Sequence, residues 1–343
     1  MSIQFDKVQP KTKEQLKQLI NYAFKHDIYD LNFIDTSKIT NMSWLFENVK
    51  HNFDVSNWDV SNVTYMNGIF NSCFKFKGKG LENWNVSNVT SMYSMFTACE
   101  NFEGKGLENW NVSNVTDMRH MFRLCKKFDC DLSNWNVSNV TDMAYMFNGC
   151  TNFKVKGLEH LDVSNVTYMA CMFAECKKFD CDLSDWDVSN VTDMYSMFTM
   201  CENFKGKGLE NWDVSKVKNM YSMFYGCKKL NCDLSNWDVS NVTNMACMFN
   251  GCTNFKVKGL EHLDVSNVTD MARMFAGCKK FDCDLSDWDV SNVTDMYSMF
   301  TMCENFKGKG LENWDVSKVK NTNYMFAGCD KITTPKWYKK YNF

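Results

Sequence analysis

The architecture follows from residues 186–211, which read Trp186-Asp-Val-Ser-Asn-Val-Thr-Asp-Met-Tyr-Ser-Met-Phe-Thr-Met-Cys-Glu-Asn-Phe-Lys-Gly-Lys-Gly-Leu-Glu-Asn211. This text of about 25 or 26 residues occurs twelve times between Ile34 and Lys331. A fixed period of this length is typical of a solenoid, because one unit cannot bury its own apolar face and neighbours must stack over a shared core. The copies begin at Ile34, Trp58, Trp84, Trp110, Trp135, Leu161, Trp186, Trp212, Trp237, Leu263, Trp288 and Trp314.

Within one copy the apolar residues follow two different periods. The alternation of Phe128, Cys130 and Leu132 with aspartates predicts a short strand with one buried face. The wider spacing from Val137 to Phe147 predicts a turn and then a short helix. The sequence therefore predicts an α/β solenoid of about twelve repeats, with a parallel β-sheet and short helices. At ~4.8 Å for each step, it would be a rod on the order of 55 Å long.

The two ends of the chain predict caps for this solenoid. Thr12 and Gln15 have the spacing of a capping box ahead of an amphipathic pattern, which predicts a helix over residues ~12–27. Trp337 can shield the last coil, as can its neighbour Tyr338. We expect a helical cap at residues 1–33, the twelve-repeat solenoid at 34–331 and an aromatic cap at 332–343, because an open coil exposes core and strand edge.

Seventeen cysteines follow the repeat and not a pairing scheme. Eleven fall in one column, four in a second, and Cys171 and Cys247 stand apart. We interpret the columns as stacks of small, buried, reduced side chains, because a thiol packs as a compact hydrophobe. Zinc is the alternative, but the close pairs have four intervening residues and no histidine recurs beside them. We expect no metal site and no cofactor.

The composition is typical of a soluble, folded protein. The net charge is −3, hydrophobic residues make up 45% and there are two prolines. No stretch approaches the ~18 consecutive apolar residues of a membrane span, so we expect no membrane insertion. The first residues show neither a secretory signal nor a lipidation motif. With the unpaired cysteines, this predicts a cytoplasmic location.

Charges alternate from copy to copy on the outward side of the predicted strand. The two outward positions are mostly acidic in 25-residue copies and basic in 26-residue copies, so neighbouring strands would carry opposite signs. We expect a self-neutralising charge ladder contributing ~0.2–1 kcal/mol for each exposed pair. Its members are Asp129, Asp131, Lys154, Lys156, Asp180, Asp182, Lys205, Lys207, Asp233, Lys256, Lys258, Asp282, Asp284, Lys307 and Lys309.

The same pattern argues against nucleic acid and catalysis. A phosphate-tracking surface needs one sign of charge along its length, whereas this ladder cancels itself every two copies. The five histidines are scattered, and no nucleophile, base and orienting acid stand outside the repeat. The Gly-Lys-Gly segments lack the lysine and hydroxyl of a phosphate loop. We therefore expect no catalytic residues.

A surface for another protein is predicted where the repeats vary. Residues 130–219 and 232–321 are almost identical. They differ at six aligned pairs: Asn136/Asp238, Asp142/Asn244, Tyr145/Cys247, Tyr168/Asp270, Cys171/Arg273 and Glu175/Gly277. Four of the six pairs fall on or next to the predicted helix. Tyrosine and arginine at such positions suit protein recognition, although a tolerant solvent face fits equally well. The candidate surface is Tyr65, Tyr93, Arg119, His120, Tyr145, Tyr168, Tyr195, Tyr221, Arg273 and Tyr297.

The string Trp-Asp-Val-Ser-Asn-Val-Thr-Asp-Met-x-x-Met-Phe-x-x-Cys, preceded by Asp-Leu-Ser-x-Trp, resembles the BspA-like leucine-rich-repeat surface proteins of mycoplasmas, other bacteria and some protist and giant-virus genomes. The resemblance covers Ile34 to Lys331. It implies a right-handed, leucine-rich-repeat-like coil used for binding and adhesion, usually on a cell surface, with no catalytic residues to carry over. A surface location is therefore the alternative to the cytoplasmic one.

Together these observations predict a non-catalytic scaffold for protein–protein interaction or adhesion. The first alternative is a passive structural repeat protein without a dedicated partner. The second is a metal-binding protein or hydrolase on the same coil. The identity of the partner is open at this point.

Overall fold

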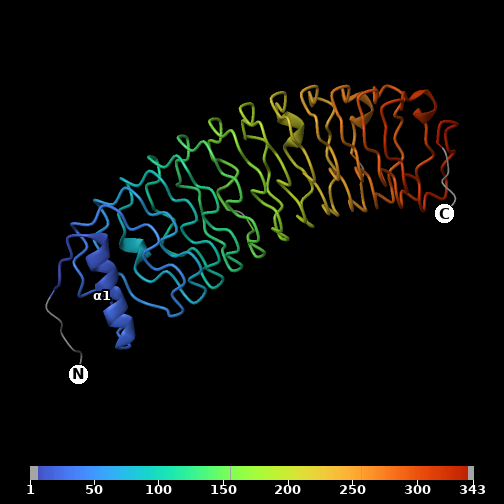
Figure 1. The fold of residues 1–343 in the computed structure, drawn as a ribbon. Helices are drawn as coiled ribbons and strands as arrows, with labels where there is room; N and C mark the ends of the chain where they lie inside the picture. The colour runs from blue at the N-terminus through green and yellow to red at the C-terminus, as the bar shows by residue number, and fades with distance from the viewer. Residues whose placement is uncertain (1–6, 155, 256, 339–343) are drawn as a thin grey trace. The chain divides into compact units, whose positions relative to one another are not determined.

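The computed structural model describes residues 7–154, 156–255 and 257–338. The chain forms two compact units, Met1–Asn165 and Val166–Phe343. Within each unit the chain winds in successive coils, one repeat to a coil (Figure 1). Each unit is therefore a repeat solenoid, as the period predicts.

One α-helix is present in the described residues, α1 (Lys13–Lys25), at the start of the first unit (Figure 1). The Thr12 hydroxyl caps α1 by accepting the Gln15 amide at 3.2 Å. Leu16 and Ile20 are buried on the inner side of α1. The helix agrees with the predicted span to within a few residues at each end.

The predicted short helices are wrong. The segment Met92–Cys99 forms two successive turns, in which the Met95 amide bonds the Met92 carbonyl at 3.1 Å and the Cys99 amide bonds the Phe96 carbonyl at 3.0 Å. The third residue of each turn, Ser94 and Ala98, has φ of 54° and 58°, which is the type II geometry. Elsewhere in the repeats the only helical elements among the described residues are 3-10 turns: η1 (Leu81–Asn83), η2 (Leu209–Asn211), η3 (Leu260–His262) and η4 (Leu311–Asn313).

Hydrogen bonding between coils explains these turns. The amides of Ser94, Phe96 and Ala98 donate to carbonyls of the next coil at 2.7–2.9 Å, and the residues between them donate within their own coil. In an α-helix these amides would donate to carbonyls of the same segment, and none would be left to bond the next coil. Spacings of three and four therefore arose here from consecutive turns that share their hydrogen bonds with a neighbour.

The predicted parallel sheet is present only as isolated bridges among the described residues. The most regular bridge series, here called the bridge column, lies directly before the first methionine of each turn segment: Asn41, Tyr65, Ser91, Asp117 and Asp142 in the first unit, and Tyr168, Asp193, Asn219, Asn244, Asp270, Asp295 and Asn321 in the second. At the predicted strand, Asp131 bridges Lys156 and Asp233 bridges Lys258. Phe128 and Leu132 are fully buried there, so the alternation of buried residues is confirmed although no strand is continuous.

The core of each unit is a stack of aromatic rings. In the first unit the rings from Phe46 to Phe147 follow one another at 5.3–5.8 Å between centroids, and in the second the rings from Phe173 to Phe326 do so at 5.6–5.8 Å. Methionines beside this phenylalanine column are fully buried, for example Met194 and Met197. They fill the core and do not form a surface.

Polar side chains at repeated positions join each coil to the one before it. The Trp212 indole donates to the Leu183 carbonyl at 3.2 Å, and the Asn241 amide donates to the Ser215 carbonyl at 2.8 Å. The Cys227 thiol donates to the Phe198 carbonyl at 3.1 Å. These bonds recur in both units, so the tryptophan, asparagine and cysteine columns are structural.

Candidate interaction faces

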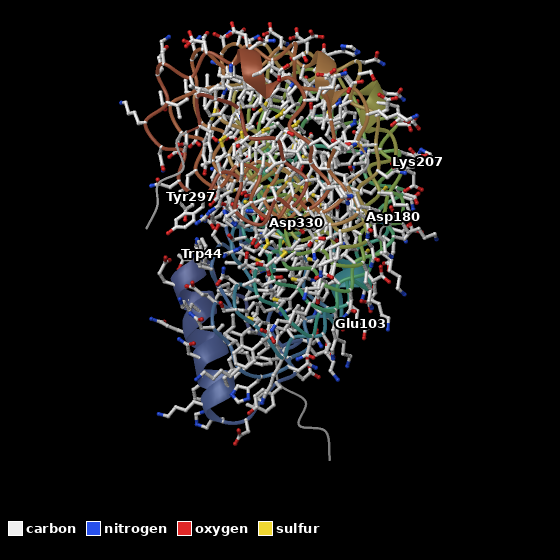
Figure 2. All side chains as sticks on the ribbon, turned by 90° about the vertical axis from the view of Figure 1, so that its right-hand side faces the viewer. Trp44, Glu103, Asp180, Lys207, Tyr297 and Asp330 are labelled. Atoms are coloured by element: carbon white, nitrogen blue, oxygen red, sulfur yellow. The ribbon has the colours of Figure 1, made fainter. Side chains whose placement is uncertain are left out.

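The charge ladder residues lie on one face of each unit, and the aromatic candidates lie on another. Figure 2 shows Tyr297 on the opposite side of the second unit from Asp180 and Lys207, and Trp44 on the opposite side of the first from Glu103. We call the first surface the charged face. We call the second the turn face, and define it as the eight-residue segment of each coil that begins at the bridge column, for example Asp193–Met200.

On the charged face, lysines pair with the aspartates of the preceding coil. Lys207 lies 2.5 Å from Asp182 and Lys309 lies 2.6 Å from Asp284. The ion pair of Lys154 with Asp129 is longer, at 3.9 Å. Close pairs also join Lys156 to Asp131, Lys205 to Asp180, and Lys307 to Asp282.

These ion pairs form modules two coils wide. Among the described residues of the second unit, Lys207 has no ion pair with the following Asp233, and Asp233 instead accepts the Ser235 amide at 3.0 Å. Lys258 bridges Asp233 through the backbone only. Lys256 lies outside the described residues. The stabilisation expected of the ladder remains a prediction.

Hydrogen bonds to cations lower the pKa of several of these carboxyls. The Lys207 ammonium, and then the Ser184 hydroxyl, lower the pKa of Asp182 to about 2. The Lys309 ammonium and the Ser286 hydroxyl do the same for the pKa of Asp284. The face is therefore neutralised pair by pair at ordinary pH.

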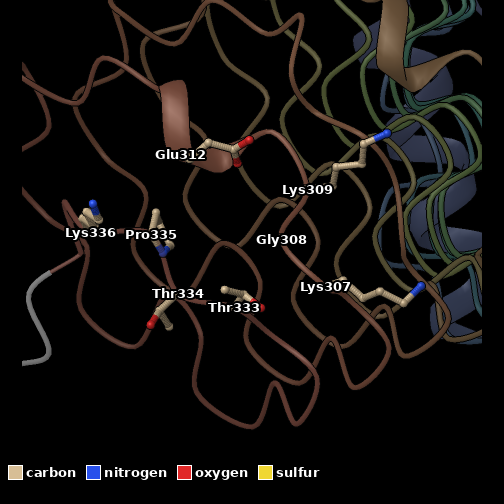
Figure 3. A pocket seen from close by; sticks show the side chains of 8 residues that line it. All are labelled: Lys307, Gly308, Lys309, Glu312, Thr333, Thr334, Pro335 and Lys336. Carbon is tan, nitrogen blue, oxygen red and sulfur yellow. The ribbon is translucent and has the colours of Figure 1, made fainter.

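Shallow hollows lie between coils on the charged face. The hollow at the carboxyl-terminal end of the second unit has a volume of about 630 Å³ and is lined by Lys307, Lys309, Glu312 and residues 333–336 (Figure 3). A hollow of about 550 Å³ lies beside Lys205 and Cys232. A third hollow of about 510 Å³ lies beside Lys258 and Cys283, so similar hollows occur at several repeats of the second unit.

The turn face brings the predicted partner-surface residues together within each unit. Tyr65 and Tyr168 lie in the bridge column. Two residues later in their coils come Tyr93, Arg119, Tyr195, Tyr221 and Tyr297, and next to that column come the left-handed positions His120, Tyr145 and Arg273. The sequence predicted these residues on or next to a helix, and the structure places them on turns; their role in binding remains a prediction.

In the first unit the aromatic side chains of the turn face touch from coil to coil. The ring centroids of Trp44 and Tyr93 are 6.3 Å apart, and those of Tyr93 and His120 are 5.6 Å apart. The rings of His120 and Tyr145 stack with 4.7 Å between their centroids. Burial, and then the nearby arginines, lower the pKa of His120. The imidazole is therefore neutral at ordinary pH and acts as part of an aromatic row.

In the second unit the turn face carries two similar aromatic groups. Tyr195 and Tyr221 stack at 5.3 Å, and Tyr297 meets Tyr324 edge-on at 5.9 Å. The Arg273 guanidinium lies 5.0 Å from the centre of the Tyr297 ring. Tyr195 and Tyr297 are equivalent residues of the duplicated block, and each has a tyrosine partner in the following coil, in a different geometry.

The turn face also collects the exposed apolar side chains of the second unit. Four large apolar residues are exposed among its described residues, and all four lie on this face: Tyr168 (50%), Met200 (37%), Met302 (54%) and Tyr324 (55%). Sequence analysis missed Met200, Met302, Tyr324 and Trp44. The signal was a glycine one coil later, because Met200 lies over Gly226, Met302 over Gly328 and Trp44 over Gly68.

No feature of the described residues resembles a catalytic or metal centre. They contain no group of three or more metal-ligating side chains. The cysteines are unpaired, and burial raises the pKa of the Cys73, Cys130 and Cys232 thiols to about 12. None of the helices in the described part of the chain has the length and apolar character needed to cross a membrane.

A solenoid of 25- to 26-residue coils with a buried cysteine column defines a leucine-rich-repeat-like protein. The chain belongs to the family described as "Mycoplasma protein of unknown function, DUF285", whose model matches residues 14–106, 67–180, 99–207, 148–260 and 248–342. The resemblance to repeat proteins found in mycoplasmas is thereby confirmed at the level of the family.

Two solved structures are similar to this chain. A leucine-rich repeat protein from Bacteroides ovatus is 15% identical, with a TM-score of 0.48, and the match covers 90% of this chain and 78% of that one. A leucine-rich repeat protein from Eubacterium ventriosum is 14% identical, with a TM-score of 0.44, and the match covers 94% and 88%. No curated protein matches the chain.

Proposed function

We propose that this protein is a non-catalytic scaffold that binds another protein through its turn face. The observation that carries the proposal is that every exposed large apolar side chain described in the second unit lies on that face. Exposed apolar and aromatic residues gathered on one surface mark interaction sites, because they lose water favourably when a partner covers them.

The internal duplication supports the same surface. Of the six pairs that differ between residues 130–219 and 232–321, five fall on the turn face: Asp142/Asn244, Tyr145/Cys247, Tyr168/Asp270, Cys171/Arg273 and Glu175/Gly277. The fully buried residues and the charged face are unchanged between the two copies. Divergence concentrated on one face is what selection for different contacts would leave, and a passive structural repeat offers no reason for it.

The proposal is tested by capturing partners with matched variants of the full chain. Replacing Tyr195, Tyr221 and Tyr297 by alanine should abolish capture, because aromatic anchors dominate interface energy, typically by ~2 kcal/mol or more each. A control carrying Lys205→Ser and Lys207→Ser on the opposite face should capture as the wild type does. Capture that survives the tyrosine changes in a variant with unchanged circular dichroism would refute the turn face as the binding surface, and no capture by the wild type would support the passive alternative.

The cysteine column bears on the compartment in which the protein works. We propose a reducing location, because each column thiol must keep its hydrogen to donate to a carbonyl, as Cys201 does to Phe173 at 3.0 Å. Adhesion at a cell surface is the second candidate, and it rests on the resemblance alone. Fractionation of the host cell, followed by detection of the full chain, separates the two.

A further inference from the structure

The turn face gathers every arginine in the chain. There are three, Arg119, Arg123 and Arg273, among 38 basic residues. Each guanidinium lies over a tyrosine ring of this face, at 5.3 Å from Tyr93, 6.0 Å from Tyr145 and 5.0 Å from Tyr297. Lysine is otherwise the basic residue of this protein, so the turn face is a surface that suits guanidinium groups in particular.

Arg119 shows how the face holds a guanidinium. Its Nη2 and Nε atoms donate to the two carboxylate oxygens of Asp117 at 2.7 and 3.0 Å. Its Nε also lies 3.6 Å from a carboxylate oxygen of Asp142, the bridge-column residue of the next coil. Two carboxylates in adjacent coils thus hold one planar cation, with the Tyr93 ring beside it.

The second unit contains the same pair of carboxylates without the arginine. Asp270 and Asp295 are bridge partners in adjacent coils, as Asp117 and Asp142 are. The residue at the place of Arg119 is Ala272, which is too short to reach either carboxylate. Among the described residues of this unit no lysine, arginine or histidine forms an ion pair with Asp270 or Asp295, whose Oδ1 atoms accept the amides of Ala272 and Tyr297.

The electrostatics of this pair agree with the geometry. Burial, and then the nearby Asp295 charge, raise the pKa of Asp270. A cation placed between the two carboxylates would remove that repulsion. The ring beside Arg119 comes from the preceding coil, where Ala246 stands in the second unit, so the two units share the carboxylates and not the aromatic ring.

We propose that Asp270 and Asp295 bind an arginine side chain presented by a partner protein. This side chain would lie over Ala272 and take the place between the two carboxylates that Arg119 takes in the first unit. The inference rests on the proposed function and specifies its partner as a protein segment that exposes arginine. A planar guanidinium can span two carboxylates with separate N–H groups, whereas an ammonium is a single point charge.

The test uses the full chain and a blocked Gly-Gly-Arg-Gly-Gly peptide with a 13C-labelled guanidinium carbon, followed by NMR titration. The wild type should bind this peptide about tenfold more tightly than the same peptide with lysine in place of arginine. Ala272→Arg should abolish binding, because the chain then fills its own site. Asp270→Asn should weaken it strongly while keeping the turn, since Asn244 and Asn219 occupy the same column naturally.

A matched variant in the first unit should gain a binding site for the arginine peptide, whereas the variants in the second unit lose one. Arg119→Ala frees Asp117 and Asp142, so the saturated chain should carry one more bound peptide than the wild type. The site is refuted if the wild type does not bind the arginine peptide, or if neither Ala272→Arg nor Asp270→Asn changes its binding. These outcomes leave the tyrosine variants of the capture experiment unaffected, so failure of the arginine site is distinguishable from failure of the proposed function.

Discussion

At the scale of single residues, the cysteines act as hydrogen-bond donors inside an apolar core. Each thiol of the main column donates to the phenylalanine carbonyl of the preceding coil, as in Cys278 to Phe249 at 3.0 Å. That carbonyl also accepts the Cys252 amide at 3.0 Å, so the thiol supplies the second of its two hydrogen bonds. Cysteine is therefore suited to this column because it is small, apolar and still able to donate.

We predict that the protein loses stability steeply in alkaline solution. Burial raises the pKa of the Cys201 and Cys227 thiols well above the ordinary value of 9.0. The folded chain therefore keeps protons that the unfolded chain releases. Stability from these thiols is complete below about pH 9 and falls as pH rises, by up to ~1.4 kcal/mol per pH unit for each thiol.

Urea unfolding between pH 8 and 10 measures this loss. The double variant Cys201→Ser and Cys227→Ser keeps a donor at each place and cannot ionise in that range. Its unfolding free energy should therefore fall less steeply with pH than that of the wild type, and parallel slopes would contradict the prediction. Lysine and tyrosine titrations are common to both proteins and cancel in the comparison.

Residue columns could be predicted from the sequence, but their neighbours across coils could not. The cysteine column follows from the period alone and is buried as expected, and the phenylalanine column, which follows from the same period, is also buried. The positions of Met200 and Met302 depend on glycines a full coil away, Gly226 and Gly328. A pattern within one repeat contains no information on such a pair, so the sequence did not indicate that these two methionines are exposed.

At the scale of elements, spacing alone does not separate a helix from consecutive turns. Both place apolar residues three and four apart. The left-handed residues of each coil distinguish them, as with Ser196 at 50° and Met200 at 59°. Glycine occupies many of these positions, at Gly149, Gly226 and Gly251, because it adopts a positive φ without strain.

The charged face provides an element-scale prediction. Lys207 and Asp182 pair across coils at 2.5 Å. Asp182→Lys should lower the melting temperature in low salt, because it places two ammonium groups side by side, and the deficit should shrink in high salt. Adding Lys207→Asp restores opposite signs and should recover most of the loss.

Calorimetry of the single and double variants at two salt concentrations measures these shifts. The loss is expected to be no more than ~1 kcal/mol, because both side chains are largely exposed. A single variant whose deficit is equal at both salt concentrations would show that charge repulsion is not its cause.

At the scale of the whole molecule, the repeat separates structure from recognition. Within each unit the core and the ladders between coils are almost invariant, whereas the turn face varies. Stability of such an array is a sum over coils and their interfaces, so changes on one face need not disturb the fold. The sequence could show which residues vary, but only coordinates could show that Asp270 and Asp295 repeat the arrangement around Arg119.

The central claim is that successive coils are held in register by the alternate amides of the turn segment. Residue-resolved amide exchange tests it directly. The Phe198 amide donates to the Met223 carbonyl at 2.9 Å, whereas the equivalent Phe326 lies in the last repeat and has no acceptor in a following coil within the described residues. We predict slow exchange at Phe198 and fast exchange at Phe326. Equal rates at the two amides would contradict the account.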